Sequence, residues 1–114
     1  MHHLWKHKDL LRMFTKLNAL QRKGVLNGAN KSLVDCVCEM CLNLLNGNIA
    51  VNSKTKSKLG QYKDVLRTLS NKKVPYVKRK RLLVQTGNGF LPFLIPPVLS
   101  LISSLAGKAI GKRI

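Results

Sequence analysis

The feature that most constrains this chain is a direct join between a cationic run and an uncharged run that contains prolines. Residues Lys78 to Arg81 are four consecutive cations, and the chain from Leu82 to Gly107 then carries no charged side chain. A dense cationic run favours a polyanionic partner, whereas a long apolar run needs cover from protein or lipid. The join therefore predicts a small packaging or delivery protein rather than an enzyme.

The charge balance points to the same class of partner. The chain has 114 residues, enough for one small domain, with 21 Lys and Arg against 4 Asp and Glu, for a net charge of +17. A small domain needs a net charge of only about 2–8 to remain soluble, so solubility does not explain the charge of this chain. We expect nucleic acid as the first candidate partner and an anionic membrane surface as the second. The alternative is a helical domain whose surface is merely basic.

The cysteines do not form a recognisable framework. Cys36, Cys38 and Cys41 are odd in number and lie close together, and no secretory signal precedes them, so we expect a reducing intracellular origin. On a helix Cys36 would point away from Cys38 and Cys41. A structural zinc site needs four ligands with suitable spacing, which this cluster does not provide. The three histidines, His2, His3 and His7, lie far off in the sequence. Buried, inert cysteines are therefore predicted, with no metal and no cofactor.

Apolar residues recur at helical spacing between Gly and Asn stops, and no alternating strand pattern competes. The expected helices are Leu4 to Lys23, Ser32 to Asn46 with Ser32 as N-cap, Lys54 to Leu69, Pro75 to just before Gly87, and Pro96–Pro97 to about Gly111. We predict an all-α fold with a bundle of about three helices in residues 1–71. A basic arm with a glycine joint follows in 72–88, and an apolar, proline-broken helix in 89–114. The C-terminal arm is expected to pack less tightly.

The candidate nucleic-acid-binding residues lie between Ser53 and Arg81, where Asp64 is the single acid. They are Lys54, Lys56, Lys58, Lys63, Arg67, Lys72, Lys73, Lys78, Arg79, Lys80 and Arg81. Lysine predominates, and it neutralises phosphates without the bidentate fork that reads guanine. Tyr62 and Tyr76 are too few to stack a single strand. Sequence-independent binding of double-stranded DNA is predicted, with a solvated helix surface as the alternative. A nuclear localisation role for Lys78 to Arg81 is compatible with both.

The apolar run is the candidate membrane or capsid contact. From Gly89 to Gly107 it is 19 residues long, near the length that spans a bilayer, yet Pro92, Pro96 and Pro97 interrupt it. An interfacial helix fits this pattern better than a spanning one, and packing on the protein's own core is the alternative. The candidate contact residues are Phe90, Leu91, Phe93, Leu94, Ile95, Leu101, Ile102 and Leu105. Catalysis is not expected, because the four carboxylates are scattered and no phosphate-binding loop is present.

Two families resemble parts of this chain. The basic run, the Gly87-Asn88-Gly89 joint and Phe90-Leu-Pro-Phe-Leu-Ile-Pro resemble the precursor of the adenovirus core protein X, also called mu, over about twenty residues. A longer resemblance, from about Ser32 to Leu105, is to a small basic X-like protein of Polinton (Maverick) elements and adintoviruses. Its segments are Cys41-Leu-Asn-Leu-Leu-Asn-Gly-Asn-Ile, Lys58-Leu-Gly-Gln-Tyr-Lys, Leu66-Arg-Thr-Leu, Lys72-Lys-Val and Arg81-Leu-Leu-Val-Gln.

The resemblance implies a virion core protein that condenses double-stranded DNA, in the virion and in the nucleus of the infected or host cell. It also implies capsid or membrane contact through the tail and a viral cysteine protease that cleaves near Gly87, Asn88 and Gly89. Gln85 departs from the usual Met, Ile or Leu of such cleavage sites. The lysine-rich basic block departs from the arginine-rich family pattern, so condensation as tight as that by protamines is not implied.

Overall fold

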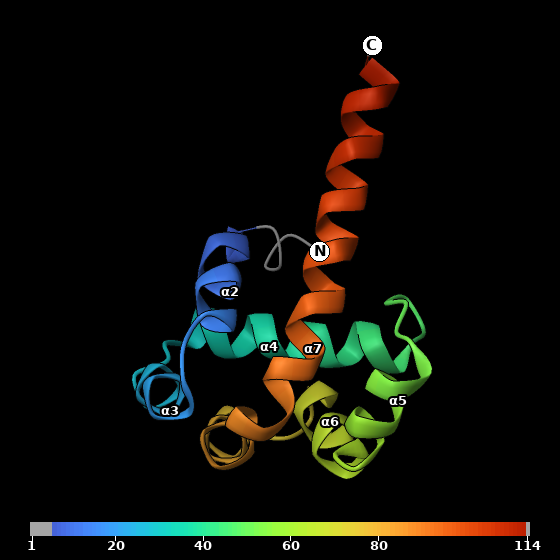
Figure 1. The fold of residues 1–114 in the computed structure, drawn as a ribbon. Coiled ribbons are helices and arrows are strands. Elements are labelled where there is room, and N and C mark those ends of the chain that lie inside the picture. The colour runs from blue at the N-terminus through green and yellow to red at the C-terminus, as the bar shows by residue number, and fades with distance from the viewer. Residues whose placement is uncertain (1–5, 114) are drawn as a thin grey trace.

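A computed structural model of the chain describes the backbone of residues 6–113 and the side chains of residues 6–103. Over that range the protein is all-α and contains no strand, as predicted. The described range holds six helices where five were expected, and the bundle predicted for residues 1–71 contains five of them rather than about three. They are α2 (Lys8–Thr15), α3 (Ala19–Asn27), α4 (Lys31–Leu45), α5 (Ser53–Gly60), α6 (Lys63–Ser70) and α7 (Tyr76–Arg113). Figure 1 shows the shorter helices gathered around one part of α7, whose far end extends beyond them.

The first predicted helix, Leu4 to Lys23, is divided into α2 and α3, so that prediction is wrong. The division comes from a capping box at Asn18. The Asn18 side chain accepts a hydrogen bond from the Gln21 backbone N–H at 2.9 Å, and the Asn18 N–H donates to the Gln21 side chain at 2.9 Å. This reciprocal pair satisfies two donors that a helix start leaves open. A new helix therefore begins at Ala19, and Gly24 lies inside it.

Asparagine also begins α4 and α5. Asn30 accepts from the Leu33 N–H at 2.9 Å, and Asn52 accepts from the Thr55 N–H at 2.8 Å. The prediction of Ser32 as the cap of α4 is therefore wrong. Ser32 lies within the first turn of α4, and its hydroxyl is 3.1 Å from the Nε2 atom of His7.

The predicted helix from Lys54 to Leu69 is divided as well, at a turn formed by Gln61 and Tyr62. Gly60, the last residue of α5, weakens a helix that would continue through it. The two resulting helices have different neighbours, because α5 packs against α7 whereas α6 packs chiefly against α4. The turn thus lets one stretch of sequence cover two sides of the core.

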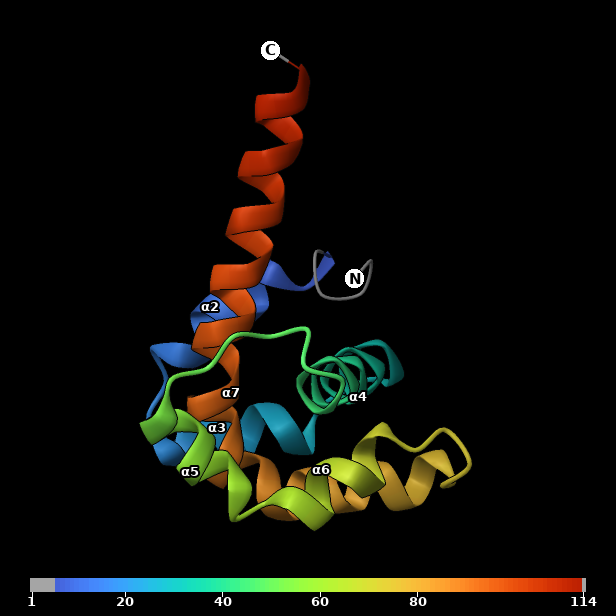
Figure 2. The ribbon, with the colours of Figure 1, turned by 90° about the vertical axis from the view of Figure 1, so that its right-hand side faces the viewer.

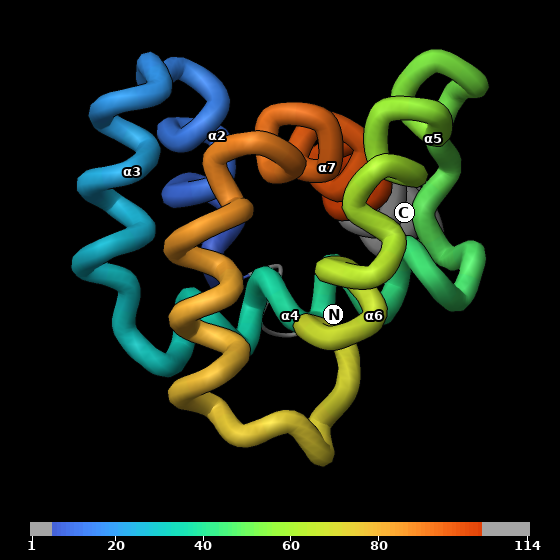
Figure 3. Tube along the Cα trace, turned by 90° about the horizontal axis from the view of Figure 1, so that it is seen from below, coloured from blue at the N-terminus to red at the C-terminus, as the bar shows by residue number. Residues whose placement is uncertain are grey.

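The C-terminal third forms one helix, α7, where two were predicted. It begins directly after Pro75, as predicted, and continues through Pro92, Pro96 and Pro97. The apolar run is therefore not broken into separate elements at its prolines. Figures 2 and 3 show that α7 bends sharply in its orange part, the colour range that includes Gly87 to Gly89. Glycines and prolines are the usual sites of sharp helix kinks.

The core is built around α7. Its buried side chains are Leu83, Phe90, Leu91, Leu94, Ile95, Val98 and Ile102. They join one cluster with buried side chains from α2, α3, α4, α5 and α6. The looser packing that was predicted for the C-terminal arm is therefore not seen over residues 83–102. A proline inside a helix typically costs about 3 kcal/mol, and full burial of each large apolar side chain, worth about 1.5–3 kcal/mol, offsets that cost.

Candidate nucleic-acid interface

The eleven predicted binding residues all lie on four consecutive parts of the chain. α5 carries three of them, α6 carries two, the loop between α6 and α7 carries two, and the first turns of α7 carry four. Nine are exposed, and Arg79 and Lys80 are half-buried. We call this set of eleven side chains the basic surface.

The fold brings these four parts together. Figure 3 shows α6 and the first turns of α7 side by side, joined by residues 71–75, and α5 leads into α6. Both α5 and α6 contact α7. In Figure 1 these elements lie toward the end of the molecule opposite the far end of α7. The bend in α7 is what separates the two ends, because it turns the helix away from α6.

The charges of the basic surface are not neutralised by the protein's own acids. The ion pairs of the described side chains are Arg12 with Asp9 at 3.9 Å and Lys31 with Asp35 at 2.8 Å, so none of the eleven basic residues takes part in one of them. Asp64, the acid nearest in sequence, is exposed in the first turn of α6, where a negative charge suits the helix dipole.

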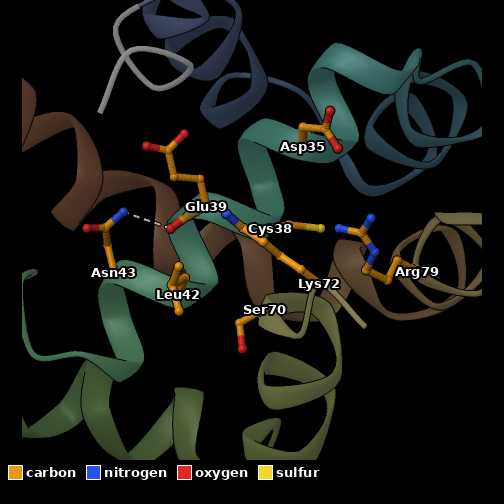
Figure 4. Close-up of a pocket in the computed structure, with 8 residues that line it drawn as sticks. All are labelled: Asp35, Cys38, Glu39, Leu42, Asn43, Ser70, Lys72 and Arg79. Carbon is orange, nitrogen blue, oxygen red and sulfur yellow. Dashed lines mark hydrogen bonds between the residues drawn. The ribbon is translucent and has the colours of Figure 1, made fainter. Parts of the chain in front are cut away.

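Two of the cations are positioned by the fold rather than free in solvent. The Arg79 Nε atom donates to the Val74 carbonyl oxygen at 3.1 Å, and the Lys58 Nζ atom lies 5.8 Å from the centre of the Phe93 ring. Arg79 and Cys38 of α4 both line a cavity of about 630 Å³, and Figure 4 shows the Cys38 sulfur pointing toward the Arg79 guanidinium. Lys72 also lines this cavity, as do Asp35 and Glu39 of α4, but neither Lys72 nor Arg79 forms an ion pair with them among the described side chains.

The two tyrosines are engaged inside the fold. The Tyr62 ring packs on Phe90 with ring centres 5.8 Å apart, and the Lys31 Nζ atom lies 5.9 Å from the centre of the Tyr76 ring. Both tyrosines are half-buried. This arrangement leaves the basic surface with lysine and arginine as its contact groups.

Most of the predicted membrane or capsid contacts lie in the core. Of the eight residues, Phe90, Leu91, Leu94, Ile95 and Ile102 are buried. Phe93 is 37% exposed, Leu101 is half-buried, and the side chain of Leu105 lies outside the described residues. In this fold a partner could therefore reach Phe93 and Leu101 without unfolding the protein.

The predicted processing site is a packed part of α7. Gly87 is buried, and a methyl group there would lie 2.9 Å from the Leu83 side chain. Asn88 accepts from the Arg22 Nε atom at 2.7 Å and donates to the Ala19 carbonyl oxygen at 2.9 Å. Gly89 lies directly beneath the Tyr62 hydroxyl. Cleavage at this site would therefore require local unfolding of the helix.

The three cysteines are buried and free, as their helical pattern predicted. Burial raises the pKa of the Cys36 thiol to about 12, with a further contribution from Glu39. Burial also raises the pKa of Cys41 and of Cys38, although Arg79 opposes the rise at Cys38. Within residues 6–103 no group of three or more His, Cys, Asp or Glu side chains could hold a metal ion. His2 and His3 lie outside the described residues.

One structural role was missed from the sequence. No role was predicted for Arg22, yet its Nη1 atom donates to the Leu17 carbonyl oxygen at 2.7 Å and its Nε atom donates to the Asn88 side chain at 2.7 Å. Arg22 therefore ties the turn between α2 and α3 to the bend of α7. The Asn18 capping box was the available signal, because it places Arg22 in the first turn of a new helix.

Comparison of the chain with models of protein families, with curated proteins and with solved structures gives no match. The resemblance to the X-like proteins of Polinton elements and to the adenovirus core protein X therefore stays a prediction from the motifs.

Proposed function

We propose that this protein binds double-stranded DNA through phosphate contacts, without sequence preference, by means of the basic surface. The observation that carries the proposal is that its eleven cations are exposed or half-buried on adjoining elements, and that none shares an ion pair with the protein's own acids in the described residues. Each phosphate contact releases counterions, so a surface of this kind gains affinity in proportion to the number of contacts it makes.

Phosphate binding fits this surface better than base reading. Eight of the eleven residues are lysines, which offer point charges rather than paired donors. The two tyrosines that could stack on bases pack against Phe90 and beneath Lys31 instead. The resemblance to the X-like proteins extends the proposal to a DNA-binding core protein of a virus or an integrated virus-like element, found in the virion core and the nucleus.

Charge reversal at matched positions tests the proposal. Lys72→Glu with Lys73→Glu lowers the net charge by four and removes two cations from the basic surface. Lys6→Glu with Lys16→Glu lowers it equally, at exposed positions outside α5, α6 and α7. We expect the first pair to reduce the salt dependence of duplex binding by about two in the slope of log K against log salt, and the second to reduce it much less. Equal effects would mean that net charge alone drives binding.

A second candidate function is contact with an anionic membrane or a capsid protein through α7. Among the described residues, one helical segment, Tyr76–Ser103, is long and apolar enough to cross a membrane. Core helices of proteins that do not enter membranes meet the same criterion, and this segment is partly buried inside the protein. The observation that favours the candidate is the far end of α7, which extends beyond the other helices (Figure 1).

Vesicle leakage tests this second function. If α7 acts on membranes, Phe93→Ser with Leu101→Ser should abolish dye release from vesicles that contain phosphatidylglycerol, because these two side chains are accessible in the fold. Leu20→Ser, which changes a side chain that is 80% exposed on α3, should not affect release. Absence of leakage by the unmodified protein would count against the membrane function.

A further inference from the structure

An open apolar groove lies between the end of α4, the loop that follows it, and the α5–α6 pair. Its volume is about 440 Å³. Its apolar lining consists of Leu44, Leu45, Ile49, Val51, Leu59 and Leu66. Ile49, Leu59 and Leu66 are almost fully buried, whereas Leu45 is 39% exposed at the rim. The groove thus combines a floor that is fixed in the core with a rim that solvent reaches.

Two lysines border this groove, and no acid lines it. Lys56 comes from α5 and Lys63 from α6, and both are exposed. Neither takes part in an ion pair among the described residues. An occupant that matches this surface must therefore present apolar side chains to the floor and negative charge to the rim.

The chemistry of the groove excludes the partners already considered. DNA phosphates could reach the lysines but would leave the apolar floor uncovered. A second copy of this chain would bring another net charge of +17 against a positive rim, so repulsion opposes self-association. A small ligand is usually enclosed on most of its surface, which an open groove does not provide, whereas an amphipathic helix buries one face only.

We propose that this groove binds an acidic amphipathic helix of a partner protein. The leucine-type side chains of that helix, spaced by three and four residues, contact the exposed Leu45 and the half-buried Leu44 and Val51 above the buried floor. Its carboxylates face Lys56 and Lys63. The inference goes beyond DNA binding, because it assigns a protein partner to a part of the surface that DNA contacts would leave uncovered. Lys56 and Lys63 belong to both surfaces, so the acidic helix and DNA should compete for them.

The test uses the full chain and a fluorescent peptide of about 15 residues, long enough to form a helix. The peptide carries leucines on one helical face and glutamates beside them. A scrambled peptide of the same composition is its control. We expect the amphipathic peptide to bind and the scrambled one to bind at least about tenfold more weakly, because anchor residues carry most of the affinity of such interfaces.

Protein variants locate the site. Lys56→Glu with Lys63→Glu should weaken peptide binding about tenfold or more, as should Leu45→Ser, because each removes a contact at the groove. The controls are Lys54→Glu, an exposed cation of α5 outside the groove, and Leu20→Ser on α3. Both controls should keep the affinity of the unmodified protein within about twofold.

The outcomes separate this inference from the proposed function. Leu45→Ser should lose the peptide and keep duplex DNA, since it changes no charge. DNA binding without peptide binding would overturn the groove proposal alone, and peptide binding without DNA binding would overturn the proposed function alone. Equal binding of the scrambled peptide would also overturn the groove proposal. So would peptide binding that anionic lipid vesicles displace and that the Leu45→Ser variant retains at full affinity.

Discussion

The first turns of α7 and its middle belong to one helix but are used in opposite ways. Lys78 to Arg81 lie at the surface beside α6, and they are exposed or half-buried. From Phe90 to Ile102 the same helix contributes six buried side chains to the core. The bend between them lets α7 leave the surface beside α6 and pass between α2 and α5 (Figure 1).

The comparison shows why an apolar run beside a cationic run need not be a second functional element. A chain of this size with a net charge of +17 must bury enough apolar surface to outweigh its own repulsion. The middle of α7 supplies much of that burial. The cationic first turns of α7 can therefore remain at the surface, because burial of the apolar middle of α7 stabilises the fold.

The largest expected effect is the loss of a core ring from the middle of α7. Phe90→Ala should destabilise the protein by about 3–5 kcal/mol, because it leaves a cavity among fully buried neighbours. Phe93→Ala, three residues later, should cost about 1 kcal/mol or less, because that ring is 37% exposed. Urea unfolding followed by circular dichroism measures both. Similar costs for the two variants would contradict the division of α7 into surface and core parts.

A smaller effect is expected at the bend. Gly89→Ala should destabilise the protein by about 1–3 kcal/mol, because the added methyl group would collide with the Tyr62 hydroxyl. Gly24→Ala is the matched control within α3, where nothing lies within 4 Å of the added group, and it should stabilise the protein by about 0.5–1 kcal/mol. Thermal unfolding distinguishes the two signs. Stabilisation by Gly89→Ala would show that Tyr62 does not pack on the bend.

The pH dependence of stability tests the burial of the cysteines of α4. Burial raises the pKa of Cys36 from 9.0 to about 12, so the folded state holds this proton more firmly than the unfolded state does. The contribution of this thiol to the free energy of unfolding is fully present below pH 9. It is lost between pH 9 and 12, at up to about 1.4 kcal/mol per pH unit. Urea unfolding at pH 8 and at pH 10 should show the fall. The Cys36→Ala variant should lose less free energy of unfolding between pH 8 and pH 10. A loss as large as that of the unmodified protein would contradict the assignment of this pH dependence to Cys36.

The smallest expected effect is at the capping box. Asn18→Ala should cost about 1 kcal/mol, because it removes the acceptor for the Gln21 N–H at the start of α3. Asn18→Ser keeps an acceptor and should cost less than half of that. Thermal unfolding of the two variants gives the comparison. Equal stability of Asn18→Ala and the unmodified protein would show that the division between α2 and α3 does not depend on the cap.

The sequence predicted the helical class and the start of α7 well, because both follow from local signals. Periodic apolar residues indicated helices, and Pro75 marked a first turn. The exposure of the basic residues also follows from their charge. The burial of Cys36, Cys38 and Cys41 in α4 is a similar case, since it was predicted from their place in a helix.

The remaining features depend on contacts between distant segments. Pro92, Pro96 and Pro97 predicted a broken element, yet burial against five other helices maintains α7 through them. Gly87 to Gly89 predicted a joint between two elements, but these residues lie inside α7, where Arg22 bonds Asn88 and Tyr62 packs on Gly89. No local pattern distinguishes an apolar run that meets a membrane from one that is covered by its own fold.

The most direct test of the proposed function is the affinity of the full chain for a duplex DNA of mixed sequence, measured across a salt series. If about eight phosphates are contacted, log K should fall with log salt at a slope near −7, with strong binding at about 50 mM salt. A second duplex of unrelated sequence should give the same line. Absence of binding at about 50 mM salt, or a slope near zero, would contradict the assignment of the basic surface to DNA phosphates.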